Sequence, residues 1–322
     1  MKDSVSKNFY KDFLSGNLNT VIVLFALITL IIFFSFFNPN FFTAKNAVAI
    51  GLLLSVVGVI CIGQTLCILI RGFDLSVGQL AALSGVVLAV LTKAGVNYFA
   101  GLLIVFTMGL VCGTIAGFLI AKLKINALIT TLALQVVYLG LVYIIADGSS
   151  VMVGSPIYSV LGTTRWLGMP VPVILLIILY FLFYFILKHT VFGRSIYCIG
   201  GNPEASRISG INVDKVVITV YILSSMLAVF AGVVLTSRMG AAQVSAGGTY
   251  ALDSVAAVVL GGVALSGGKG SIWGAFLGIA IMGVMQNGLI MIQMPTFYQF
   301  IATGIVLILA VFAQNISVIR SK

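Results

Sequence analysis

Residues 47–70 read AVAIGLLLSVVGVICIGQTLCILI, a run without a single charged side chain. About 20 consecutive apolar residues are enough to cross the hydrocarbon core of a bilayer as an α-helix. The pattern therefore predicts an all-α integral membrane protein with about ten transmembrane helices. Apolar runs of this kind fall at about residues 20–37, 47–70, 76–92, 98–121, 126–145, 171–187, 216–237, 251–265, 272–292 and 297–314.

The composition agrees with a protein that faces lipid over most of its surface. Of the 322 residues, 61% are hydrophobic and only 7% are charged, and the mean hydropathy is +1.23. A soluble domain carries about 25% charged residues. Because most connections between the apolar runs are short, we expect one transmembrane domain over residues 1–322, with its core at about 47–314.

The net charge of +10 does not indicate binding to nucleic acid, because the basic residues stand singly between apolar runs. The four cysteines lack the CxxC spacing of metal and redox sites. Three of them lie within apolar runs, where a thiol behaves as a small hydrophobic group. We therefore expect no disulfide, no metal site and no nucleic-acid partner.

The basic residues instead indicate how the chain is oriented. The run Val21–Phe37 is longer than the core of a secretory signal and no cleavage site follows it, so we interpret it as a retained helix with a cytoplasmic N-terminus. Ten crossings return the C-terminus to the cytoplasm. Thirteen of the 17 basic residues then lie inside, as the positive-inside rule expects. The inner ones are Lys2, Lys7, Lys11, Arg71, Lys122, Lys124, Lys188, Arg194, Arg207, Lys215, Lys269, Arg320 and Lys322, and the outer ones are Lys45, Lys93, Arg165 and Arg238.

Two connections are longer than the others: residues 146–170, expected outside, and residues 188–215, expected inside. The inner connection divides the chain into a first helix and two sets of about five helices, and an odd number per set would invert one set relative to the other. A short echo supports such a repeat. Phe73-Asp74-Leu75-Ser76-Val77 opens the third run, and Tyr250-Ala251-Leu252-Asp253-Ser254-Val255 opens the eighth. Chance similarity is the alternative.

The distribution of acidic residues argues against proton coupling. Proton-driven carriers usually place a carboxylate deep in the bundle, because a charge at mid-membrane is kept mainly for function. All seven acidic residues here are expected at helix ends or in loops. Sodium could still bind through carbonyl and hydroxyl oxygens, so the distribution weakens ion coupling without excluding it.

The chain also lacks the motifs of an enzyme. Residues 266–271, SGGKGS, resemble a phosphate-binding loop, but that pattern needs a glycine at Val263 and a Ser or Thr after Lys269. The sequence contains neither HExxH nor GxSxG, and its single histidine, His189, is expected at an inner helix end. We expect no catalytic residue and no cofactor in this chain, so any ATP hydrolysis must take place on another subunit.

The inner connection contains a short helix with clear signals at both ends. Asn202 suits the N-cap, Pro203 the first helical position, and Gly210 the C-terminal stop. Glu204 complements the positive end of the helix dipole and can pair with Arg207 on one face. The helix is either a rigid element for docking a partner or a simple connector. Its residues are Asn202, Pro203, Glu204, Ala205, Ser206, Arg207, Ile208, Ser209 and Gly210.

Other residues allow a functional and a structural interpretation. Asp74, Ser76 and Asp253 could gate the two membrane faces, or the carboxylates could cap free backbone N–H groups at helix starts. Glycines recur every fourth residue at 109–117 and at 270–278, a spacing that favours close packing of helices. Polar residues in or near the runs could line a substrate path or bridge helices: Gln64, Asn126, Gln135 and Asn287.

Four stretches together resemble a known family. They are residues 38–43 (NPNFFT), residues 72–78 (GFDLSVG), residues 193–212 and residues 250–270. In this order and at this spacing they resemble the permease subunits of bacterial ribose-type ABC importers, a family that also serves galactosides, xylose, allose and autoinducer-2. The resemblance covers nearly the whole chain. Arg71 and Phe73 depart from the pattern, in which smaller or aliphatic residues are common.

The resemblance implies a multi-pass permease of the bacterial inner membrane, embedded in lipid, that imports a monosaccharide, with ribose as the expected cargo. It implies an ABC ATPase subunit and a periplasmic sugar-binding protein as partners, and a homodimer or a pair with a related permease. It also makes the helix of about residues 203–210 the coupling helix that contacts the ATPase. An ATPase-independent secondary sugar carrier is the main alternative, and an integral-membrane enzyme is the third.

Overall fold

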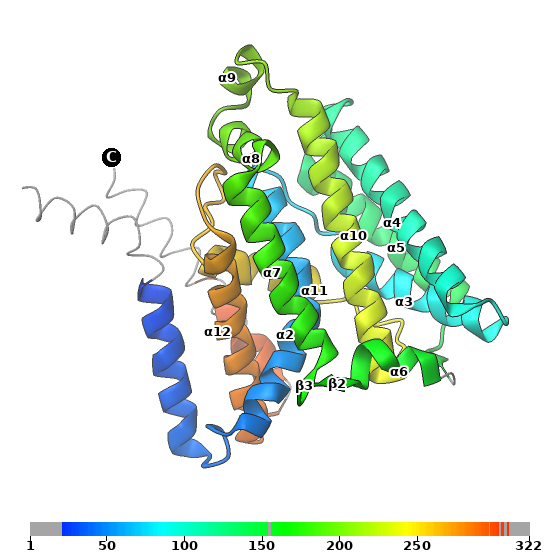
Figure 1. Cartoon of the computed structure of the whole chain (residues 1–322), viewed down its shortest axis with the longest axis vertical. Coiled ribbons are helices and arrows are strands. Elements are labelled where there is room, and N and C mark those ends of the chain that lie inside the picture. The colour runs from blue at the N-terminus through cyan, green and yellow to red at the C-terminus, as the bar shows by residue number, and fades with distance from the viewer. Residues whose placement is uncertain (1–20, 154–155, 296, 303, 306–307, 309–322) are drawn as a thin grey trace, which may run out of the picture.

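The computed structural model describes residues 21–153, 156–295, 297–302, 304–305 and 308, which form a bundle of helices (Figure 1). Most helices coincide with the predicted apolar runs, and polar N-cap residues such as Thr43, Asn97, Asn126 and Ser271 fix where they begin. The helices are Val21–Phe37, α2 (Ala44–Leu69), α3 (Val77–Lys93), α4 (Tyr98–Ala121), α5 (Ala127–Ile145), α6 (Pro156–Thr163), α7 (Val171–His189), α8 (Val191–Gly201), α9 (Pro203–Ile208), α10 (Val213–Met239), α11 (Tyr250–Leu260) and α12 (Ile272–Met291). The strands are β1 (Val151–Met152), β2 (Arg165–Trp166), β3 (Met169–Pro170) and β4 (Ala241–Ala242).

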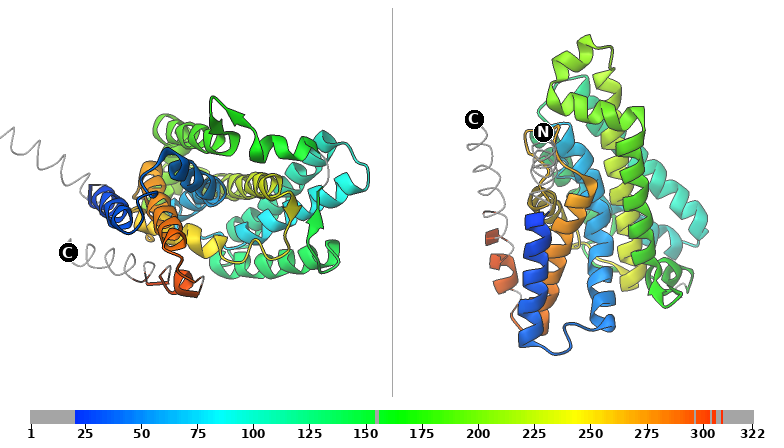
Figure 2. Two further views of the ribbon diagram at one scale, coloured as in Figure 1. Left: turned by 90° about the horizontal axis from the view of Figure 1, so that it is seen from below. Right: turned by 60° about the vertical axis from the view of Figure 1, so that its left-hand side comes forward.

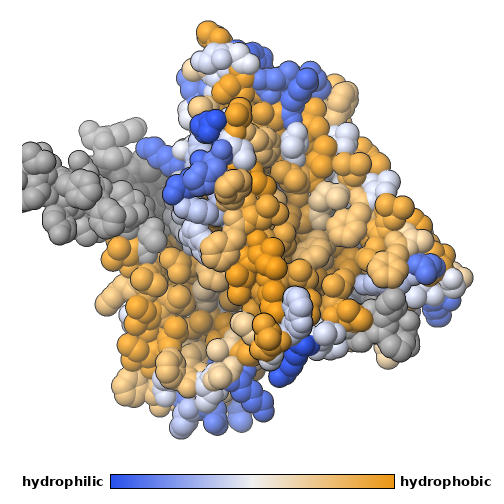
Figure 3. Space-filling view, viewed as in Figure 1, coloured by the Kyte–Doolittle hydropathy of each residue, from blue (hydrophilic) through white to orange (hydrophobic). Residues whose placement is uncertain are grey.

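Helix α2 is the centre of the bundle, and α7, α10, α11 and α12 all pack against it. From Leu54 to Leu69 nearly every side chain of α2 is buried. By contrast, α4 and α5 bury only a minority of their side chains and expose large apolar ones, such as Leu103 and Val136, on the outside. An apolar belt therefore lies between polar ends (Figure 3), as expected for a multi-pass membrane protein.

The glycine spacing serves helix packing at the positions that are helical, as predicted, whereas Gly270 lies before α12 and not on its face. Gly113 of α4 lies so close to α10 that an added Cβ would come within 2.6 Å of the Ile222 Cα atom, and one on Gly117 within 2.7 Å of the Ile218 Cα atom. On α12, Gly274 and Gly278 contact the backbone of α11 in the same way. Small residues at these positions let helix backbones approach closely.

The predicted number of crossings is supported in part. Six of the described helices are long and apolar enough to span a membrane: α2, α4, α5, α7, α10 and α12. Helices Val21–Phe37, α3 and α11 are apolar but shorter. The last predicted run, 297–314, is helical at residues 297–302, and most of the remainder lies outside the described residues.

The eighth predicted crossing is wrong in its extent. The apolar run 251–265 forms a helix only as far as Leu260. Gly261 then contacts the backbone of Gly274, and Gly262 turns the chain with a φ of +84°. At 1.5 Å per residue, α11 covers only about half of a hydrocarbon core roughly 30 Å thick. Hydropathy cannot register this ending, because the residues after the turn are also apolar.

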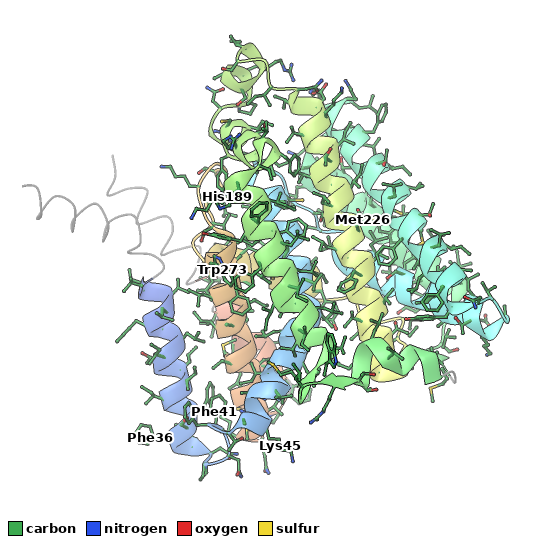
Figure 4. All side chains as sticks on the ribbon, viewed as in Figure 1. Phe36, Phe41, Lys45, His189, Met226 and Trp273 are labelled. Carbon is green, nitrogen blue, oxygen red and sulfur yellow. The ribbon has the colours of Figure 1, made fainter. Side chains whose placement is uncertain are left out.

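The two long connections lie at opposite ends of the bundle. At one end, here called the α9 end, α9 extends beyond the long helices and α8 lies beside the end of α10, with His189 nearby (Figures 1 and 4). Lys45 lies at the opposite end (Figure 4). Within the other connection, β1 pairs with β4 and β2 pairs with β3.

The first helix, Val21–Phe37, stands at the edge of the bundle beside α12 (Figure 2). Phe34 packs with Phe41 and with Val284 of α12, and the Asn38 amide donates a hydrogen bond to the Met291 carbonyl at 3.0 Å. The stretch NPNFFT, which contributes to the family resemblance, therefore turns the chain from the edge of the bundle towards α2.

Candidate functional site

Helices α7, α8 and α9 follow one another with a single residue at each junction. Thr190 ends α7 and also caps α8, accepting a hydrogen bond from the Gly193 N–H at 3.1 Å. Asn202 ends α8 and caps α9, accepting one from the Ala205 N–H at 3.1 Å. Because no flexible linker separates these helices, a displacement of α9 must be transmitted to the end of α8.

Helix α9 forms as predicted, with Asn202 as its N-cap and Pro203 in the first turn. Its C-terminus is closed by two backbone hydrogen bonds, from Gly210 to the Arg207 carbonyl and from Ile211 to the Ser206 carbonyl, both at 3.0 Å. Gly210 has a φ of +87°, the left-handed conformation that this kind of helix stop requires. Ile208 is 87% exposed, an apolar side chain offered to solvent or to a partner.

Asp214, in the first turn of α10, ties α9 to neighbouring helices. Its carboxylate contacts Lys122 at 3.0 Å, Lys124 at 3.1 Å and Arg207 at 3.4 Å. The sequence predicts Glu204, within α9, as the partner of Arg207. In the structure Arg207 instead contacts Asp214 of α10. The contact brings together three basic residues that the charge rule assigned to the cytoplasmic side.

Helix α8 rests on the loop between α11 and α12. The Tyr197 hydroxyl donates a hydrogen bond to the Gly270 carbonyl at 3.0 Å, and burial raises the pKa of this phenol, so that it remains a donor. Gly200 lies so near the Leu69 carbonyl and Gly268 that a Cβ would overlap with their backbone atoms. The C-terminal end of α8 therefore contacts both the end of α2 and the loop at residues 261–271.

Asp74 is completely buried, in the non-helical segment between α2 and α3. One carboxylate oxygen accepts hydrogen bonds from the Ser76 N–H at 3.1 Å and the Ser76 hydroxyl at 2.6 Å. The other accepts a hydrogen bond from the Ser224 hydroxyl of α10 at 2.8 Å. Asp74 therefore joins the segment to α10. Its bond with the N–H of Ser76, the N-cap residue of α3, is a contact at a helix start of the kind that the capping interpretation describes.

The burial of Asp74 corrects one argument from the sequence. The carboxyl group does lie in a loop, as predicted, but this loop runs through the interior of the protein. The inference that no carboxylate lies deep in the bundle is therefore wrong for Asp74. A polar interior carboxylate leaves the ion-coupled alternative open to a direct test.

Asp253 occupies a different setting. It is part of α11 itself, in the first turn of the helix. Its own N–H already bonds the Thr249 carbonyl at 2.9 Å, and in the described part of the chain no backbone N–H donates to its carboxylate as the predicted cap requires. Asp253 is partly exposed and lines a small hollow between α2 and α12, with Leu54, Met282 and Gln286.

The four polar candidates for a substrate path have different surroundings. Asn126 is the N-cap of α5 and so has a structural role. Gln135 is partly exposed on the same helix. Gln64 is fully buried in α2, and neither of its side-chain polar atoms finds a hydrogen-bond partner within the described part of the chain. The side-chain oxygen of Asn287 likewise finds no hydrogen-bond partner there. The structure does not join these residues into one site.

Residues 46–311 match the family model described as "Branched-chain amino acid transport system / permease component". That range includes α2 from its third residue, all the elements from α3 to α12, and every candidate site residue named above. The chain belongs to this permease family. The match confirms a transport protein and leaves the membrane enzyme, the third alternative, without support.

Relatives of this permease are similar over nearly their whole length. It is 40% identical to the ribose import permease protein of Escherichia coli over 296 residues, covering 91% of this chain and 92% of that protein. It is 39% identical to the ribose import permease protein of Haemophilus influenzae, covering 90% and 91%. The L-arabinose transport system permease protein of Escherichia coli is 38% identical, covering 90% and 88%. No solved structure matches the chain. The resemblance to ribose-type permeases is confirmed.

Proposed function

We propose that this permease is the membrane subunit of an ATP-driven importer that carries a monosaccharide, ribose or a similar pentose, across the bacterial inner membrane. The observation that carries the proposal is the match at about 40% identity, without large gaps in coverage, to proteins named ribose import permeases. The proposed partners are a separate ABC ATPase subunit, a periplasmic sugar-binding protein, and a second copy of the chain or a related permease.

The proposed topology has ten crossings in two inverted sets, with both termini in the cytoplasm. The charge distribution supports this orientation, because Lys122, Lys124 and Arg207 meet at one carboxylate at the α9 end. Arg71 and the 188–215 connection, also assigned to the inside, lie at the same end. In this orientation α9 extends into the cytoplasm, where an ATPase can reach it.

We propose α9, with its caps Asn202 and Gly210, as the coupling helix. Three features support this role: the helix is rigidly capped at both ends, it carries the exposed Ile208, and it is joined to α8 through one residue. A helix held in this way can transmit a force from a bound partner without losing its own structure. Replacing Gly210 by Ala, which strains the left-handed turn, should lower sugar import per ATP hydrolysed without preventing membrane insertion.

The test is reconstitution in vesicles with the binding protein outside and ATP inside, using radiolabelled ribose, arabinose and leucine. The proposal expects ATP-dependent accumulation of a pentose that requires the ATPase subunit and the binding protein. Uptake of leucine in place of both sugars would contradict the cargo and favour the amino acid named in the family description.

A secondary carrier remains the rival function, and the buried Asp74 is the observation that favours it. The same vesicles separate the two. The permease alone, without ATPase or ATP, should show no ribose accumulation under an imposed proton or sodium gradient. Accumulation under either gradient, lost in Asp74→Asn, would contradict the importer proposal.

A further inference from the structure

Arg71 adopts a backbone conformation that arginine rarely takes. It follows α2 and its cap residue Ile70, and its φ is +65°. A non-glycine residue in the left-handed region costs about 1–2 kcal/mol, and the next residue, Gly72, is of the type that would avoid this cost. Arg71 is also one of the two departures from the family pattern. Its side chain therefore needs a specific explanation.

The guanidinium group of Arg71 binds the last carbonyls of α8. The Nε atom donates to the Gly200 carbonyl at 2.7 Å, and an Nη atom donates to the Gly201 carbonyl. Carbonyls at a helix C-terminus lack partners within the helix and carry partial negative charge. The planar fork of arginine presents N–H groups to two adjacent acceptors in a fixed geometry, which the ammonium group of lysine does not reproduce. The Cγ atom of Arg71 also packs against Gly267, which has no room for a side chain on that side.

The same segment is fixed to α10 at its other end. The Tyr221 hydroxyl donates to the Phe73 carbonyl at 3.1 Å, and the Ser224 hydroxyl donates to Asp74 at 2.8 Å. A Cβ on Gly72 would come within 2.5 Å of the Tyr221 hydroxyl, so the backbone at Gly72 lies against the end of this α10 side chain. Residues 71–74 therefore bridge the end of α8 and the middle of α10, and Asp74 binds Ser76 at the start of α3 as well.

We propose that Arg71 is a positioning residue for transport, a clamp that makes residues 70–76, and with them α3 and α10, follow movements of α8 and α9. Apart from the exposed Arg71 and the partly exposed Phe73, this segment is buried. The proposal rests on the proposed function, because it assigns the route by which the coupling helix acts on the bundle. Asn202 and α9 follow Gly201 directly, so a force on α9 acts on the two carbonyls that Arg71 holds. The hydrogen bond between Asp74 and Ser224 then transmits this force to α10.

The test compares Arg71→Gln and Arg71→Lys with a control, Arg194→Gln. This control removes a positive charge from an exposed position on α8, the helix whose end Arg71 binds. Each variant is purified as the full complex with its ATPase, and pentose import and ATP hydrolysis are measured in the same vesicles. Arg71→Gln should lower the import per ATP by about 2- to 30-fold, as expected for coupling energies of about 0.5–2 kcal/mol. Arg71→Lys should lower the import per ATP less than Arg71→Gln does. Arg194→Gln should leave the import per ATP at the wild-type value.

A second measurement separates transmission from a merely structural role. If Arg71 and Asp74 act in one linkage, Arg71→Gln combined with Asp74→Asn should lower the ratio hardly more than either change alone. Two results would contradict the clamp without affecting the proposed function. One is a wild-type import per ATP in assembled Arg71 variants, and the other is that the effects of the two changes simply add. A wild-type complex without ATP-dependent pentose import would overturn the proposed function and the clamp together.

Discussion

The two echoing stretches, residues 73–77 and 250–255, look alike in sequence and differ in structure. In the first, Asp74 stands outside any helix and is completely buried, with Ser76 as the N-cap of α3. In the second, Asp253 lies within α11, partly exposed, and Ser254 bonds the Ala251 carbonyl of its own helix at 2.7 Å. The same pairing of an Asp and a Ser near a helix start therefore gives an interior connection in one case and a local one in the other.

The two regions are also neighbours. Gly78 of α3 and Gly247 before α11 approach so closely that a Cβ on either would overlap with the backbone of the other. This contact brings the starts of α3 and α11 together, although about 170 residues separate them in the chain. The comparison teaches that the first stretch is hydrogen-bonded to α10 in the interior, whereas the second faces the hollow beside α12. The predictions below test that difference.

The largest expected effect is on Asp74. Asp74→Ala removes a buried acceptor of three hydrogen bonds and leaves the Ser76 and Ser224 donors unpaired, so the free energy of unfolding should fall by about 3 kcal/mol or more. Asp253→Ala, at a partly exposed site, should lower it by less than about 1 kcal/mol. Denaturation of both variants in the same detergent measures the difference, and equal losses would contradict the distinction drawn here.

Transport by the milder Asn variants tests the gating hypothesis for the same two residues. Asp74→Asn and Asp253→Asn keep the size of each side chain. If the carboxylates gate, import should fall in variants that remain folded and assembled. Normal import in both would exclude gating, and reduced yield of folded protein with normal import per complex would favour a structural role.

The next effect concerns the contact between the two regions. Gly78→Ala places a Cβ against the Gly247 carbonyl and should lower stability by about 1–3 kcal/mol, the usual range for overpacking. Gly140→Ala is the matched control, because Gly140 is also helical and nothing lies within 4 Å of its added Cβ. That control should be neutral or stabilising by up to about 1 kcal/mol. Thermal unfolding in detergent measures both, and a harmless Gly78→Ala would show that α3 and α11 separate without cost.

A smaller difference is expected between the two serines. Ser224→Ala removes a hydrogen bond to a carboxylate and should cost about 1.5–3 kcal/mol. Ser254→Ala removes only a bond within its own helix turn and should change stability by less than about 0.5 kcal/mol. Both residues are buried, so the two variants lose similar volume and differ in the bond removed. A larger loss in Ser254→Ala would reverse the assignment of interior and local roles.

The smallest effect should come from Asp214, a carboxylate at the surface. Its three basic partners have side chains at least 50% exposed, so solvent and salt screen each pair. Asp214→Asn should lower stability by about 1 kcal/mol in low salt and by less in high salt. Repeating the Asp74→Ala measurement in high salt should leave its loss unchanged, because that carboxylate is buried. A salt-independent loss in Asp214→Asn would show that Asp214 resembles Asp74 more than its exposure suggests.

Much of the fold follows from local patterns in the sequence. Apolar runs gave the positions of α2, α4, α5, α7, α10 and α12, and the capping residues Asn202 and Gly210 gave the short helix α9. The end of α11 was missed because a glycine turn stopped it within a run that is still apolar. The partner of Arg207 was missed because Asp214 lies one helix further on, beyond the reach of a spacing rule within α9.

The amino-acid sequence alone determined that this protein lies in a membrane, where most of its helices run, and to which family it is similar. These properties depend on hydropathy, capping and motifs, each contained within a few turns of one segment. Only the tertiary structure decided that Asp74 is buried and that Arg71 holds the end of α8. The partners of those side chains, Ser224 and Gly200, lie 150 and 129 residues away in the chain, and only the packed bundle brings them within hydrogen-bond distance.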